Sequence, residues 1–133
     1  YGMAQHFNLN RLMENIRKKY EELLGFVPEN IEKRLKLAAL SDETDAIEII
    51  EKYREKLIYN NPLDKKTQQL VHFALLIGGM HKEPAKLHAK GALKAGATVK
   101  ELFGVCETAA ITGGMPAFSM AVDCVFEAIE NPD

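Results

Sequence analysis

The 133-residue sequence has little of what marks several large classes of protein. It holds only two cysteines, Cys106 and Cys124, which are too few for the disulfide framework of a small secreted domain. Its formal net charge is -2, so it lacks the basic surplus that binds nucleic acid or anionic lipid. No apolar run approaches the length of a bilayer span, and no segment resembles a secretory signal. We therefore expect a cytoplasmic protein without nucleic-acid or membrane partners.

The two-residue alternation of a β-strand is also missing, and apolar residues recur instead at helical spacing. Ser41 and Asp64 are candidate N-caps, and Thr98 with Glu101 forms a candidate capping box. The sequence thus predicts an all-α bundle of about six to seven helices, near residues 9–24, 28–40, 42–58, 65–78, 83–95, 99–113 and 115–130.

Asn60-Asn61-Pro62 is the clearest break in the chain. Residues 1–60 are charged and long-chained, and we expect an N-terminal helical extension that packs on the core. Residues 61–133 are rich in alanine and glycine, and we expect them to form that core within a single structural domain. Small residues let helices approach closely but bury little apolar area each. We infer that subunits share a core in a homo-oligomer.

The segment 81–96 carries the residues with the most chemistry. His81 and His88 lie seven residues apart, and a helical wheel places His88 on the side of the small residues. His88 is then either a core histidine or a general acid or base. A metal site built from His72, His81 and His88 is disfavoured by their spacing, and we predict no metal. Lysines 82, 86, 90 and 94 form a stripe that we interpret as solvated, with anchoring of an anionic substrate as the alternative.

Four stretches together resemble the carboxymuconolactone decarboxylase family, which includes the AhpD-like alkylhydroperoxidases. They are Leu63 to Leu70, the helix that holds His88, Ala92 to Thr98, and Gly114 to Ala117. The resemblance covers about residues 61–130. It implies an all-helical AhpD-like domain that assembles into homotrimers or homohexamers, with a site under the histidine helix.

The redox branch of that family uses a Glu, a Cys-x-x-Cys pair and a His. On this sequence these positions hold Gln69, His81, Pro84 and His88, so only the histidine is retained. A disulfide-cycling peroxidase needs thiols that these positions do not supply, which excludes its usual mechanism. Cys106 and Cys124 could replace the pair in principle, although both align with core positions.

The decarboxylase branch also lacks the cysteine pair and keeps the histidine. The resemblance therefore favours a cofactor-free lyase that acts on a small carboxylated or lactone-like metabolite, with His88 as catalytic acid or base. Gln69, His72 and His81 are the candidate substrate-binding residues. One alternative is an antioxidant protein that detoxifies peroxide in oxidative stress with non-standard residues. Another is an oligomeric binding protein without catalysis, so the sequence leaves open whether the protein is an enzyme.

Overall fold

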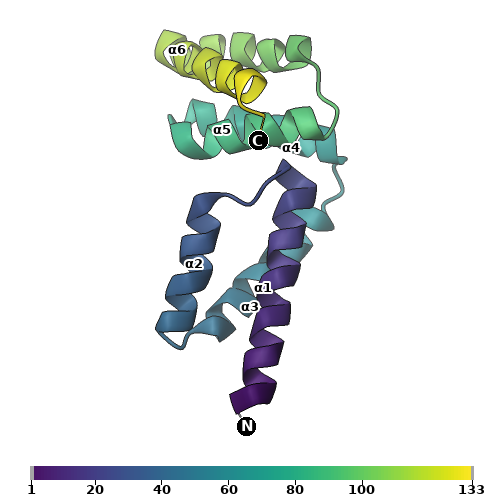
Figure 1. The fold of residues 1–133 in the computed structure, drawn as a ribbon. Coiled ribbons are helices and arrows are strands. Elements are labelled where there is room, and N and C mark those ends of the chain that lie inside the picture. Colours follow the sequence, from purple (N-terminus) through teal and green to yellow (C-terminus); the bar gives the residue numbers. More distant parts are fainter. Residues whose placement is uncertain (1, 133) are drawn as a thin grey trace. The chain divides into compact units, whose positions relative to one another are not determined.

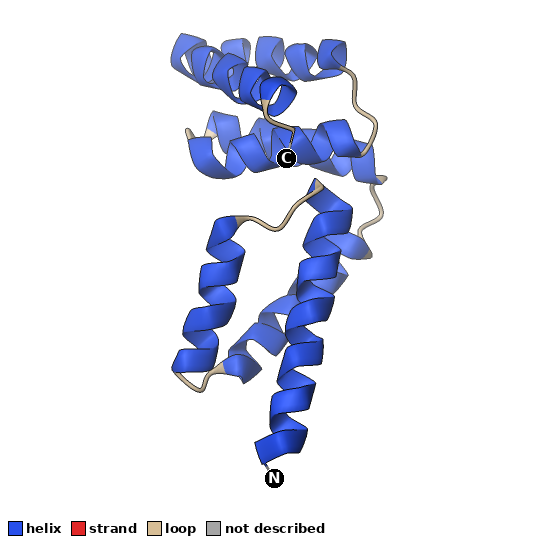
Figure 2. Ribbon diagram, viewed as in Figure 1, coloured by secondary structure: helices blue, strands red, loops and turns tan. Residues whose placement is uncertain are grey.

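The computed structural model describes the backbone of residues 2–132 and the side chains of residues 9–132. Over this part of the chain it contains helices and no strand, which confirms the all-α prediction (Figures 1 and 2). The elements are α1 (Gly2–Leu24), α2 (Glu29–Leu40), α3 (Thr44–Arg54), the π-helical turn η1 (Glu55–Tyr59), α4 (Lys65–Gly78), α5 (Lys82–Lys94) and α6 (Val99–Glu130).

Most helix ends lie where the sequence predicts them. The side chain of Asp64 accepts a hydrogen bond from the backbone N–H of Thr67 at 2.9 Å and so caps α4. Thr98 and Glu101 form the predicted capping box of α6. Inside α6, Gly114 has φ 83° and ψ 176°, values that break the helix at the point where the sequence predicts the end of one helix and the start of another.

The start of α3 differs from the prediction. Ser41 does not cap that helix, because its hydroxyl donates to the carbonyl of Leu37 at 2.7 Å at the end of α2. Asp42 then adopts φ 56°, and α3 begins at Thr44 without a side-chain cap. Serine hydroxyls bond to backbone groups at either end of a helix, so the residue type alone did not identify the end.

The chain forms two compact units. Unit 1 comprises Tyr1–Glu22 and Phe26–Pro62, and unit 2 comprises Leu23–Gly25 and Leu63–Asp133. The chain passes from unit 1 to unit 2 immediately after the Asn60-Asn61-Pro62 break. The packing of an N-terminal extension on the core stays a prediction.

Unit 2 is built from α4, α5 and α6, which all contact one another (Figure 1). Its core combines a few large side chains with many small ones. The buried apolar residues with no exposed surface are Phe73, Ile77, Ala85, Ala89, Ala92, Leu102, Cys106, Ala117, Ala121, Cys124 and Ala128. The alanines let the helix backbones approach closely, as their sequence pattern predicted.

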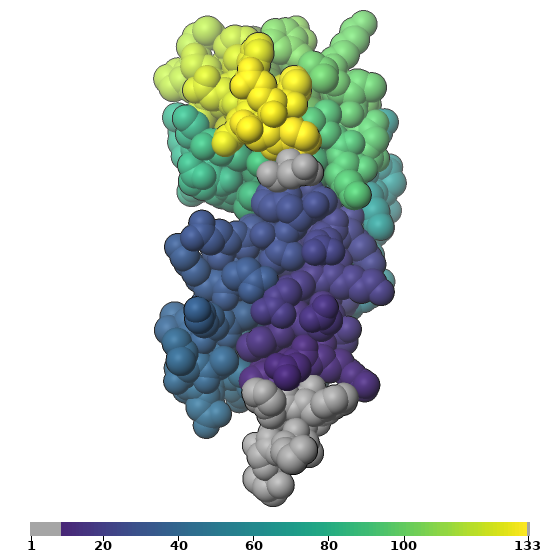
Figure 3. Space-filling view, in the orientation of Figure 1, coloured from purple at the N-terminus to yellow at the C-terminus, as the bar shows by residue number. Residues whose placement is uncertain are grey.

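Helix α6 is long and apolar enough to cross a membrane by length and composition, although the core helix of a soluble domain has the same properties. The break at Gly114 divides it into residues 99–113 and 115–130, each shorter than the roughly 20 residues of a membrane-spanning helix. The second half lies partly on the surface of unit 2 (Figure 3).

Unit 1 combines a core of large apolar residues with charged and aromatic side chains around η1. The guanidinium of Arg54 lies 4.4 Å from the ring centre of Tyr20, and the ammonium of Lys19 lies 5.3 Å from that of Tyr59. Lys19 also forms an ion pair with Glu55. Cation–π contacts and an ion pair thus hold the π-helical turn against α1.

Candidate functional site

The candidate site lies within unit 2, where α4 and α5 present side chains to each other. Gln69 and His72 are one helical turn apart on α4 and therefore lie on the same face. His88 lies in the middle of α5, between the buried Ala85 and Ala92. Packing of α4 against α5 brings these three polar side chains together.

The closest polar contact of the site joins Gln69 to His88. Oε1 of Gln69 lies 2.7 Å from Nδ1 of His88, and Gln69 has no exposed surface. An amide oxygen can only accept a hydrogen bond, so Nδ1 of His88 is the donor. The neutral imidazole then carries its lone pair on Nε2.

The ring of His72 stacks on that of His88. Their ring centres are 4.4 Å apart, and the ring planes differ by 24°. His72 is partly buried and fixes one face of the His88 ring. Two imidazolium rings this close would repel each other, so the arrangement favours at most one positive charge on the pair.

Gly91 supplies the space for the Gln69 side chain. A Cβ atom at this position would lie 2.7 Å from Oε1 of Gln69 and 2.9 Å from Cδ2 of Leu24. Such distances are shorter than van der Waals contact, so any larger residue displaces the amide or the leucine. The sequence showed that Gly91 shares a face with His88, but it did not reveal this contact.

Comparison with known protein families identifies the architecture that carries these residues. Residues 44–127 match the model of the Carboxymuconolactone decarboxylase family, which is more than half of the chain. The protein belongs to this family. The match begins at the start of α3, upstream of the stretches that carry the resemblance in the sequence. Searches of curated proteins and of solved structures give no match.

His81 lies apart from the cluster that Gln69, His72 and His88 form in this family member. It is exposed and immediately precedes α5, seven residues or about 10 Å along the helix axis from His88. Its ring lies against Gly79, where an added Cβ would be 2.8 Å from His81 Cδ2. A role for His81 in substrate binding stays a prediction, as do the roles of Gln69 and His72.

The two cysteines lie in the core of unit 2, as their alignment with apolar positions predicted. Both have no exposed surface, and burial raises the pKa of each thiol, that of Cys124 to about 11. Both side chains are therefore thiols at neutral pH. This environment is typical of a structural cysteine.

Two lysines of the stripe on α5 form ion pairs that the sequence did not predict. Lys86 lies 3.1 Å from Glu127 of α6 and 3.2 Å from Glu83, and its side chain is only 23% exposed. Lys82 lies 3.8 Å from Asp123 of α6. The prediction of a solvated lysine is wrong for Lys86, because the second half of α6 turns back after Gly114 and places Glu127 beside it.

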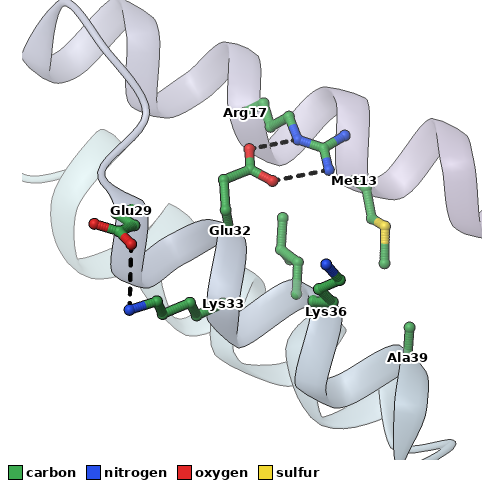
Figure 4. A pocket seen from close by; sticks show the side chains of 8 residues that line it. Met13, Arg17, Glu29, Glu32, Lys33, Lys36 and Ala39 are labelled. Carbon is green, nitrogen blue, oxygen red and sulfur yellow. Dashed lines mark hydrogen bonds and ion pairs between the residues drawn. The ribbon is translucent and has the colours of Figure 1, made fainter.

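No group of three or more potential metal ligands of the His, Cys, Asp or Glu type lies together among the described residues. A pocket of about 520 Å³ lies in unit 1 between α1 and α2. Arg17 and Glu32 form a two-fold hydrogen-bonded ion pair in its wall, and Lys33 pairs with Glu29 (Figure 4). No residue of α4 or α5 lines this pocket, so it is separate from the histidine site.

Proposed function

We propose that this protein is a cofactor-free lyase that acts on a small carboxylated or lactone-like metabolite, with His88 as its acid/base residue. Membership of the carboxymuconolactone decarboxylase family supports the reaction class. The observation that carries the proposal is the 2.7 Å hydrogen bond between Gln69 and Nδ1 of His88, because it orients the imidazole and assigns proton exchange to Nε2.

The chemistry that this arrangement fits is decarboxylation next to a conjugated carbonyl group. The bond between the carboxylate and its carbon breaks, carbon dioxide leaves, and the electron pair passes into the carbonyl to give an enolate. The imidazolium form of His88 donates its Nε2 proton to the carbon and becomes neutral. Nδ1–H stays bonded to Gln69 throughout, and water returns a proton to Nε2.

Substrate binding is assigned to Gln69, His72 and His81 as part of the same proposal. Nε2 of Gln69 is buried and has no hydrogen-bond partner among the described residues. An unpaired buried amide donor costs about 1–3 kcal/mol. An oxygen atom of a carboxylate or enolate would remove that cost once neighbouring side chains move to admit the substrate. His72 stacks on His88, so a second imidazole lies beside the proposed acid/base residue.

Reduction of peroxide by Cys106 and Cys124 is the less favoured function. Attack on a peroxide needs a thiolate, and burial raises the pKa of both thiols. No described contact joins the two sulfur atoms, and Cys124 Sγ lies 3.8 Å from the backbone carbonyl of Lys82. An antioxidant role would therefore need a rearrangement of the core of unit 2.

Homo-oligomer formation in the cytoplasm completes the proposal. Several large apolar side chains of α6 are exposed, among them Ile111 at 87% and Met115 at 62%. Side chains of this kind mark a surface that contacts another chain where they form a contiguous patch. The family resemblance points to a trimer or hexamer, and light scattering on the purified protein would give the subunit number.

The decisive experiment replaces His88 with glutamine and follows carbon dioxide release from a panel of carboxymuconolactones and related carboxylated lactones. We expect turnover to fall by about 10²-fold or more, because the proton donor is lost. The matched control is Lys94→Gln, which lies exposed on the same helix and should keep full turnover.

Two results would contradict the proposal. Unchanged turnover in His88→Gln would remove the histidine from the mechanism. A wild-type protein that binds members of the panel without releasing carbon dioxide would instead have the non-catalytic binding function.

A further inference from the structure

The amide of Gln69 is fixed from two sides. One side is the 2.7 Å contact between its Oε1 atom and Nδ1 of His88. The other side is the backbone of Gly91, where even a methyl group would come within 2.7 Å of the same oxygen. Gln69 also has no exposed surface, so water does not compete for this oxygen in the folded protein. The Gln69 side chain is therefore held in place by packing as well as by its hydrogen bond to His88.

We propose that Gln69 is a positioning residue that holds His88 in the tautomer with its proton on Nδ1. Gly91 is part of the same arrangement, because its missing side chain leaves the space that the Gln69 amide occupies. The assignment of the tautomer rests on geometry alone. Its importance for turnover rests on the proposed function, because it makes Nε2 the nitrogen that exchanges protons with a substrate.

The choice of an amide rather than a carboxylate has a chemical consequence. Both groups accept a hydrogen bond from Nδ1–H, but only a carboxylate adds a negative charge that stabilises the imidazolium. Gln69 therefore orients the ring without an ion pair. The stacked ring of His72 adds no negative charge either. The described contacts of His88 with Gln69 and His72 thus orient its ring without adding a negative charge.

The tautomer can be measured directly by long-range ¹H–¹⁵N NMR on the full-length protein without substrate. The His88 signals are assigned by their absence from the His88→Gln variant. In the wild-type protein we expect the signature of protonated Nδ1 and unprotonated Nε2. Gln69→Leu removes the acceptor while keeping the volume, and we expect a mixture of tautomers or the opposite one.

Gln69→Glu separates positioning from packing. It restores an acceptor, so the Nδ1–H signature should persist, and the added charge should move the titration of His88 to higher pH by about one unit or more. The matched control is Gln68→Leu, which changes a buried glutamine on the same helix and should leave the His88 signals unchanged. If Gln69→Leu does not fold, Gly91→Ala gives the same test, because the methyl group displaces Oε1 and should weaken the Nδ1–H signature.

Two results would overturn the inference: protonated Nε2 in the wild-type protein, or an undisturbed Nδ1–H signature in both Gln69→Leu and Gly91→Ala. These measurements need no turnover. The lyase proposal can therefore fail in the His88→Gln assay while the tautomer assignment holds. The tautomer assignment can likewise fail in the NMR measurement while the His88→Gln variant still loses turnover.

Discussion

Units 1 and 2 are both helical, but different side chains hold their helices together. Unit 1 buries large apolar residues such as Ile16, Ile31 and Leu35, and it places charged groups at the edges of that core. Unit 2 buries mainly alanines, with Phe73 and Ile77 among a few large residues. Close backbone approach leaves little room for added volume. Unit 2 should therefore be the more sensitive of the two to added side-chain volume, and the exposed ion pairs of unit 1 should make small contributions.

The largest expected effect comes from enlarging a buried alanine of unit 2. Ala89 has no exposed surface, so Ala89→Leu forces neighbouring side chains or backbone to move. We expect a loss of about 1–3 kcal/mol in the free energy of unfolding, measured by urea titration. Ala46→Leu on the exposed face of α3 should change it by less than about 0.5 kcal/mol. Equal losses in the two variants would remove the contrast between the units.

A smaller effect is expected for the charges of unit 1 when pH is varied. Burial raises the pKa of Glu51 above its ordinary value of 4.5, an effect that the charge of Arg54 reduces. The folded protein then keeps a proton that the unfolded chain releases, so stability falls as pH rises from 4.5 through the folded pKa. Glu51→Gln removes this titration, and it should become more stable relative to wild type as pH rises through that window.

Glu32 supplies the control of opposite sign. Its hydrogen bonds to Arg17 hold its pKa below the ordinary value, so its contribution is present above 4.5 and is lost as pH falls through the lower, folded pKa. Urea midpoints measured between about pH 3 and pH 7 check both trends. A Glu51→Gln variant that follows the wild-type pH profile in parallel would contradict the role of burial.

The smallest effect is expected for the ion pair in the wall of the unit 1 pocket. The side chains of Arg17 and Glu32 are 36% and 44% exposed, so solvent screens their attraction. Arg17→Gln should cost about 1 kcal/mol or less, and the difference from wild type should shrink in high salt. A larger loss that is insensitive to salt would show that packing of the arginine stem matters more than its charge.

The sequence predicted those features that depend on local chemistry. Asp64 and the Thr98–Glu101 capping box mark their helix ends because a side chain and a nearby backbone N–H suffice to form each cap. Gly114 interrupts a helix for an equally local reason. Ser41 was assigned to the wrong helix because its hydroxyl can bond to either of two neighbouring ends.

The features of unit 2 that the sequence did not predict depend on contacts between helices. The wheel placed His88 on the packed face of α5, and the family resemblance placed Gln69 and His72 in the same site, but the hydrogen bond from His88 to Gln69 and the stacking of His72 on His88 became visible only in the structure. The pairing of Lys86 with Glu127 likewise needs the return of α6 after Gly114. Helical periodicity fixes which way a side chain points and not which partner it meets.

The close approach of Gly91 to Gln69 has a consequence for how the family diversifies. The two positions share one small volume, so a change at one restricts what the other accepts. A relative with alanine in place of Gly91 should carry a shorter side chain, or a differently directed one, in place of Gln69. These two positions are therefore expected to vary together among relatives, and that covariation would mark which members share the same imidazole partner.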